Sequence, residues 1–243
     1  MATSLTGSAV PLFQVFLTTI VSKGRLLVLG LLGAIGPGVG LLIGQRTIAS
    51  RRTEAWTFVA SNYGLTLLAG VGSLVVAAAS LGTLAEDSTL VYLWLRPVAR
   101  WKLALLAWLG ALAILLPLVT VSLLLGGLFA GASNQATLGG VGAAILAVSA
   151  YGAVFTWLGL RTKRPLSWGL AYMLVWEGFV ARAGNGAARL AVASYTRSIL
   201  ARAAHVELRL ANRAQWTSFV LPLLVTVLGL VLTTRRLRRT DVA

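Results

Sequence analysis

The chain has 243 residues, of which 58% are hydrophobic and 11% are charged, and its mean hydropathy is +0.86. It also carries a formal net charge of +15, from 21 Lys and Arg against 6 Asp and Glu. Soluble domains contain about 25% charged residues, so this chain has too few polar side chains to cover a surface in water. The composition excludes an ordinary soluble domain and predicts an integral membrane protein.

The residue types that hold metals and cofactors are nearly absent. The chain has no cysteine, so disulfides, thiolate nucleophiles and thiolate metal sites are excluded. His205, Met1 and Met173 leave almost no ligands for a haem, copper or zinc site. We therefore expect no cofactor and no metal in this chain. Residues 1–22 contain no Lys or Arg, unlike the start of a signal peptide, so we expect the first span to stay in the mature protein.

Six predominantly apolar stretches are long enough to cross a bilayer as helices. Each is too long and too uniformly apolar for a barrel strand, and helices satisfy their own backbone groups in lipid. We place the spans at residues 26–44, 58–80, 103–131, 138–160, 166–183 and 217–234. The predicted fold class is all-α: a polytopic integral membrane protein with six transmembrane helices, forming a single domain over residues 1–243.

The orientation follows from the Lys and Arg residues of the short connections, which favour the cytoplasmic side. Arg161, Lys163 and Arg164 crowd into the connection after the fourth span, whereas the connection 132–137 carries no charge. We expect a multi-pass protein of the cell inner (plasma) membrane with both termini in the cytoplasm.

Two features accompany the first span. Before it, Phe13, Phe16, Leu17 and Ile20 recur at helical spacing, opposite the polar stripe of Gln14, Thr18 and Ser22. This pattern predicts an N-terminal interfacial helix, with an extension of the first span as the alternative. Within the span, Gly36, Gly40 and Gly44 form a small-residue face that favours close helix packing. A contact within the chain and a contact between two subunits both remain open.

Residues 184–215 form a polar connection, rich in Ala and Arg, that suits one or two short helices. Tyr195, Arg202, Arg209 and Trp216 suggest that part of it rests on the outer membrane surface. It is either a gate over an exit route or a solvated linker held by lipid phosphates.

The connection 82–102 differs from the others. Glu86 and Asp87 open it, Ser88 or Thr89 can cap a helix, and Pro97 ends that helix after an apolar face of Leu90, Leu93 and Trp94. We expect a short amphipathic helix parallel to the inner membrane surface. The acidic pair suits the positive end of its dipole.

This loop resembles the segment between spans two and three of the permease subunits of type 2 ABC exporters. The matching residues are Glu86, Asp87, Ser88, Thr89, Leu90, Tyr92, Leu93, Arg96, Pro97 and Arg100. The family usually has Gly before Thr-Leu, where this chain has Ser88. The rest of the resemblance lies in the number of spans, the interfacial helix and the long outer connection, and only the loop motif is specific.

The resemblance implies that the loop is a cytoplasmic coupling helix that docks on a separate ABC ATPase subunit. It also implies a second permease copy or a related permease, with the two meeting through the first and fifth spans. The chain itself has no phosphate-binding loop, because Lys23, Lys102 and Lys163 are not followed by Ser or Thr. We therefore expect no enzyme activity in this chain, with ATP and Mg bound by the partner.

The remaining partners follow from the distribution of charge. The cations flank the spans, so we expect contacts with membrane lipids and no nucleic acid. Glu177 lies within the fifth span and is a functional candidate for that reason. One alternative is that Glu177 binds substrate or carries a proton. The other is that it makes a structural polar contact at the outer gate with Arg182 or Asn185.

Two other functions remain in competition with an exporter subunit. A secondary transporter would place ionisable groups near the middle of the membrane, and a scaffold would not transport at all. The sequence does not identify the transported substrate, and export as the direction is implied only by the resemblance.

Overall fold

The computed structural model describes residues 22–86, 99–180, 185–208, 211 and 213–239, and every element within these ranges is a helix. The helices are α2 (Lys23–Arg46), η1 (Ala49–Arg51), α3 (Arg52–Val59), η2 (Ala60–Val71), α4 (Gly72–Glu86), α6 (Arg100–Ala130), α7 (Asn134–Arg161), α8 (Pro165–Ala171), η3 (Tyr172–Val180), α10 (Asn185–Ala188), α11 (Val192–Ala204) and α12 (Gln215–Arg239). η1 is a 3₁₀ turn, whereas η2 and η3 are π-helices.

Five helical stretches of the described chain are long and apolar enough to cross a membrane: Lys23–Arg46, Ala49–Gly82, Arg100–Ala130, Asn134–Arg161 and Gln215–Arg239. They contain the first, second, third, fourth and sixth predicted spans, each with a few residues of difference at its ends. The chain is thus a helical membrane protein. The second stretch extends well beyond the predicted 58–80, because the α3 helix already begins at Arg52.

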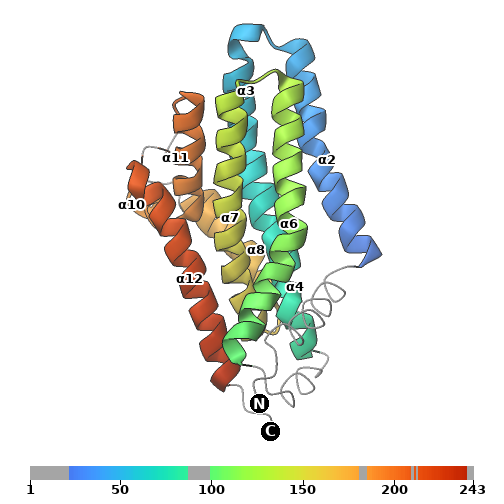
Figure 1. Cartoon of the computed structure of the whole chain (residues 1–243), viewed down its shortest axis with the longest axis vertical. Helices are drawn as coiled ribbons and strands as arrows, with labels where there is room; N and C mark the ends of the chain where they lie inside the picture. Colours follow the sequence, from blue (N-terminus) through green and yellow to red (C-terminus); the bar gives the residue numbers. More distant parts are fainter. Residues whose placement is uncertain (1–21, 87–98, 181–184, 209–210, 212, 240–243) are drawn as a thin grey trace, which may run out of the picture.

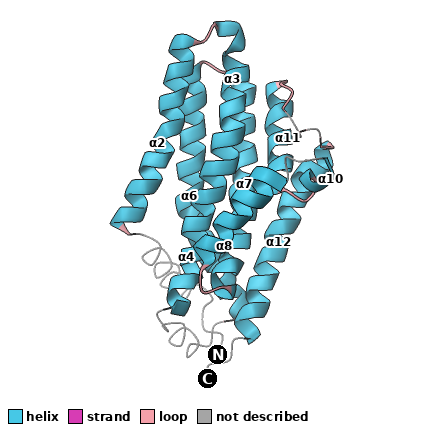
Figure 2. Cartoon of the chain, turned by 180° about the vertical axis from the view of Figure 1, so that it is seen from behind, coloured by secondary structure: helices cyan, strands magenta, loops and turns pink. Residues whose placement is uncertain are grey.

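α6 and α7 run side by side through the middle of the bundle (Figure 1). α2 packs along α6, whereas α4, α11 and α12 pack against α7. Seen from behind, α8 lies in front of the bundle near the end at which α12 finishes (Figure 2). α2 and α6 begin toward this end, and α4, α7 and α12 finish there (Figure 1). α7 and α12 therefore run in the same direction, and residues 162–214 must carry the chain back between them.

Small residues set the contact between α2 and α6. Gly36 and Gly40 lie directly against Ser122 and Gly126 of α6. A Cβ atom at Gly36 would collide with the Ser122 hydroxyl, and one at Gly40 would collide with the Gly126 backbone. The Ser122 hydroxyl donates to the Gly33 carbonyl at 2.7 Å across the same contact. In lipid, where apolar burial does not drive helices together, such close backbone packing holds the pair.

The corner between α2 and α3 is fixed by polar contacts at the end of the bundle opposite the end of α12 (Figure 1). The Arg52 guanidinium donates to the carbonyls of Gly44 and Thr47, at 2.7 and 3.1 Å. It therefore satisfies carbonyl groups at the end of α2 that have no partner within the helix. The Ser133 hydroxyl caps α7 by accepting from the Ala136 amide at 3.2 Å.

The expectation that the connection 184–215 rests on the membrane surface is wrong for α11. This helix packs against α7 and α12, and ten consecutive residues, 192–201, are buried. Half of them are Ala, Ser and Thr, so the helix can approach α7 closely, where Gly139 faces Ala203. Polar side chains of the segment find partners inside the bundle rather than in water.

Candidate functional site

Glu177 lies in η3 with only 1% of its surface exposed. Its Oε1 atom accepts a hydrogen bond from the Tyr172 hydroxyl at 3.1 Å and another from the Val192 amide at 3.0 Å. Its Oε2 atom accepts from the Ala193 amide at 3.4 Å. The two amides open α11, so this carboxyl group joins η3 to the start of a helix that follows it in the chain.

The contact is chemically well matched. The first amides of a helix have no carbonyl partner within it, and the N-terminal end of a helix carries a partial positive charge. A carboxylate supplies acceptors for these amides and charge for the dipole. Ala191, the residue at the cap position of α11, has no side chain that could do the same. Glu177 thus caps α11 from a neighbouring helix.

Aromatic and sulfur-containing side chains surround this carboxyl group. Tyr172 meets the edge of Phe155 with ring centres 6.2 Å apart, and Phe155 in turn stacks on Tyr151 at 6.2 Å. Tyr151 and Phe155 are fully buried in α7. Met173 occupies the space beside Gly70, where a side chain on η2 would collide with it. The packing excludes water from the face of α7 next to Glu177.

A second polar contact anchors α11 one turn further along. Arg197 is 9% exposed, and its guanidinium donates to the Thr66 hydroxyl at 2.7 Å and to the Asn62 side-chain oxygen at 3.4 Å. Both acceptors belong to the π-helix η2, whose wide turn also lets Thr66 donate to the Ser61 carbonyl at 3.0 Å. π-Turns within membrane helices are frequent at functional sites.

The candidate site is therefore a buried polar link, which we call the α11 anchor: Glu177, Tyr172, Arg197, Thr66 and Asn62. It connects three elements far apart in the sequence, namely η2, η3 and α11. Buried ionisable groups in membrane proteins are costly and persist where they are paired. This arrangement can hold α11 in one position and release it if one of the contacts opens.

The predicted partners of Glu177, Arg182 and Asn185, are not tested by the structure. Arg182 lies outside the described residues, and the side chain of Asn185 is likewise not described. Within the described chain, the partners are Tyr172 and two backbone amides. Arg197 was not singled out, because in the sequence it resembles the other arginines of the connection. The polar run Ser61-Asn62-Tyr63 inside an apolar stretch was the available signal for a buried polar partner.

The predicted coupling residues lie mostly outside the described ranges. Glu86 is the last residue of α4 and Arg100 is the first of α6, and the others, at positions 87–97, fall in a segment that is not described. The predicted packing residues Gly36, Gly40 and Gly44 face α6 within this chain, where Gly44 approaches Phe129.

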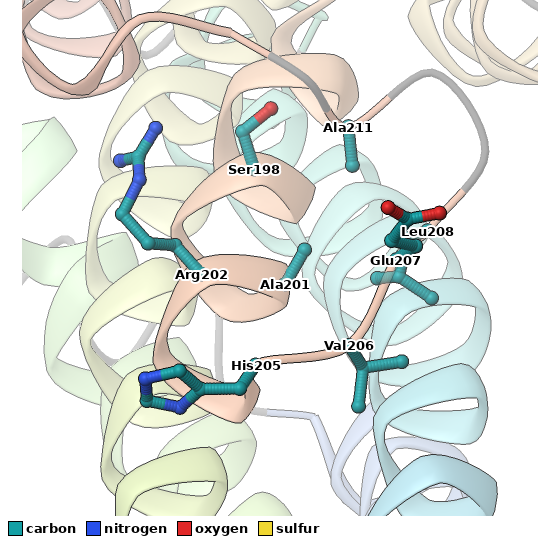
Figure 3. A pocket seen from close by; sticks show the side chains of 8 residues that line it. All are labelled: Ser198, Ala201, Arg202, His205, Val206, Glu207, Leu208 and Ala211. Carbon is teal, nitrogen blue, oxygen red and sulfur yellow. The ribbon is translucent and has the colours of Figure 1, made fainter.

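An open hollow of about 490 Å³ lies where α11 ends. Figure 3 shows Arg202 and His205 on one side of this hollow and Glu207 on the non-helical segment across from them. Arg202 donates to the Arg213 carbonyl at 2.6 Å, which ties α11 to the residues before α12. No group of three His, Cys, Asp or Glu side chains that could hold a metal occurs in the described part of the chain.

Comparison with protein-family models, with curated proteins and with solved structures gives no match to this chain.

Proposed function

We propose that this chain is the transmembrane permease subunit of an ATP-driven ABC exporter of the type 2 class. The observation that carries the proposal is the motif of loop 82–102, together with the points where that loop leaves and rejoins the bundle. α4 ends at Glu86 and α6 begins at Arg100, toward the end of the bundle at which α12 also finishes (Figure 1). An ATPase subunit on that side would contact the loop and the ends of these two helices together.

The packing supports the use of this loop as a lever. α4 and α6 both pack against the central α7, and Gly159 of α7 brings the α4 backbone near Ala78 into direct contact. Packed helices move as rigid bodies rather than deforming continuously. A displacement of the loop by ATP binding in a partner would therefore reach the middle of the bundle through α4 and α6.

The proposed permease has six spans, and residues 166–183 provide the fifth crossing. Support comes from chain direction: α7 and α12 run the same way, so the segment between them must return across the bundle. α8 and η3 form a continuous helical stretch from Pro165 to Val180, and α11 then continues inside the bundle. Irregular helices are tolerated at membrane depth where protein surrounds them. The α11 anchor satisfies this condition.

A second permease copy is part of the proposal. The exposed side of α8 and η3 is strongly apolar, with Leu174 68%, Val175 57% and Phe179 77% exposed. α2 also exposes large apolar side chains, among them Leu27 at 63%. Lipid or another permease can cover these faces. The pairing of permeases through the first and fifth spans, as the resemblance implies, would use both of them.

A secondary transporter and a non-transporting scaffold are the competing functions. A secondary transporter driven by protons could use Glu177 as its proton carrier, since this carboxyl group is buried within a helix. Against this, its oxygens already accept three hydrogen bonds that hold α11 in place. A proton carrier would have to break this cap during each cycle.

The test is co-purification of the full chain with its ATPase. We expect the tagged chain, extracted mildly from native membranes, to carry vanadate-sensitive ATPase activity. Glu86→Gln, Thr89→Trp and Arg96→Ala should reduce the bound activity several-fold. Glu54→Gln and Arg51→Ala are the controls, because these exposed residues lie at the opposite end of the bundle. An active transporter that purifies without any ATPase would contradict the proposal.

A further inference from the structure

A cationic hollow lies between α2, α4 and the α7–α8 corner. It has a volume of about 310 Å³, and its charged lining residues are Arg25, Lys163 and Arg164. Its floor is apolar and is made by α4 residues such as Val75 together with Leu166 of α8. Figure 2 shows these helices from the face on which α8 lies, near the end at which α12 finishes.

The charge of this hollow has one sign. Arg25, Lys163 and Arg164 line it, and its described lining contains no carboxyl group. Lys163 and Arg164 are exposed, and their side chains have no partner among the described residues. Lys163 and Arg164 are neighbours in the chain, so their positive charges repel one another unless an anion lies near both. The hollow is therefore complementary to a compact anion, such as a phosphate group.

An apolar cleft continues from the cationic hollow along α2. It has a volume of about 200 Å³ and shares Arg25 and Val75 with the hollow. The remaining lining residues are glycines and aliphatic side chains, among them Val28 and Leu32 of α2 and Val71 of η2. The extensive contacts of α2 are with α6, so this part of α2 leaves a gap toward α4. The cleft is suited to a hydrocarbon chain.

We propose that the hollow and the cleft together bind one anionic phospholipid. Its phosphate lies at Lys163 and Arg164, and one acyl chain enters the cleft between α2 and α4. Charge selects the headgroup, because a phosphocholine lipid would bring its own cation next to Lys163 and Arg164, whereas a phosphatidylglycerol headgroup brings none. This assignment does not depend on an ATPase partner or on transport.

Selective lipid retention tests the headgroup. The full chain is purified in nanodiscs of equal parts phosphatidylglycerol and phosphatidylcholine, then released into detergent, and the lipids that stay bound are counted by native mass spectrometry. We expect retained phosphatidylglycerol to exceed phosphatidylcholine. Lys163→Gln with Arg164→Gln should lower that preference about thirty-fold, since each cation near an anionic headgroup contributes about five-fold.

A matched pair of substitutions controls for net charge. Arg238→Gln with Arg239→Gln removes two exposed cations from the end of α12, outside the hollow. We expect this variant to keep the wild-type preference. Equal losses in the two double variants would show a general effect of charge and would overturn the proposal. The same holds if excess inorganic phosphate abolishes the preference, because the site would then recognise a free anion.

The acyl chain has its own test. Val28→Trp fills the cleft, whereas Leu27→Trp places the same side chain on the neighbouring residue, which does not line it. We expect Val28→Trp to lower phosphatidylglycerol retention at least five-fold and Leu27→Trp to leave it unchanged. If Val28→Trp instead shifts the chain from dimer to monomer with lipid retention unchanged, a second copy covers the cleft and the lipid assignment is wrong.

Discussion

Gly40 lies where the backbone of α2 touches that of α6, at Gly126. Gly40→Ala should destabilise the protein by about 1 to 3 kcal/mol, because the added methyl group forces the two helices apart. Gly38 is the matched control on the same helix, since nothing lies within 4 Å of a Cβ atom there. Thermal unfolding in detergent measures both. Equal melting temperatures for the two variants would contradict the packing described for α2 and α6.

The structural role of the Glu177 carboxyl group can be tested separately from a role in transport. Glu177→Gln keeps one side-chain oxygen as a hydrogen-bond acceptor. It replaces the other oxygen with an NH₂ group, which cannot accept a hydrogen bond from a backbone amide. We expect a loss of about 1 to 3 kcal/mol in stability, the cost of leaving a buried polar group unsatisfied. Glu207→Gln, at an exposed position, serves as the control in the same melting experiment. A Glu177→Gln protein that melts like the wild type would show that the carboxylate does not hold α11.

α11 is the element whose position depends most on individual polar contacts. Thr66→Val removes the hydroxyl that accepts from Arg197 and should weaken the link to η2 by about 1.5 to 3 kcal/mol, the range for hydrogen bonds to charged groups. Hydrogen exchange should rise in residues 192–204 and stay unchanged in α6. Thr217→Val, at an exposed site near the start of α12, should leave both unchanged. Equal protection of α11 in both variants would contradict the anchor.

The elements also differ in how well the sequence predicts them. Hydropathy alone places α2, α6, α7 and α12, because each helix must be apolar along most of its length to sit in lipid. α11 has no such signal, because Ser, Thr and Arg residues interrupt its apolar residues, and contacts made by Glu177 and Arg197 join it to other helices. Val192 is 15 residues from Glu177 in the sequence, and Thr66 is 131 residues from Arg197, so local periodicity does not reveal either contact.

At the scale of the whole molecule, the excess of Lys and Arg over Asp and Glu can be located on the helices. Lys163 and Arg164 lie just after α7 ends, and Arg238 and Arg239 lie at the end of α12, and these two helices finish toward the same end of the bundle (Figure 1). The predicted orientation, in which Lys and Arg favour the cytoplasmic side, would place this end in the cytoplasm. The side of the membrane on which each connection lies can be tested directly. Because the chain contains no cysteine, a single introduced cysteine is the only residue that a thiol reagent would label.

A single-cysteine cross-linking experiment tests the central claim most directly. Ser88→Cys places the only thiol in the proposed coupling loop, and Ser50→Cys places it in η1, between α2 and α3 at the far end of the bundle. In membranes from the native host, treated with a bifunctional thiol reagent, we predict that Ser88→Cys joins the chain to an ATP-binding protein and that Ser50→Cys does not. Absence of that adduct for Ser88→Cys, in a chain whose thiol labels from the cytoplasmic side, would contradict an ABC permease.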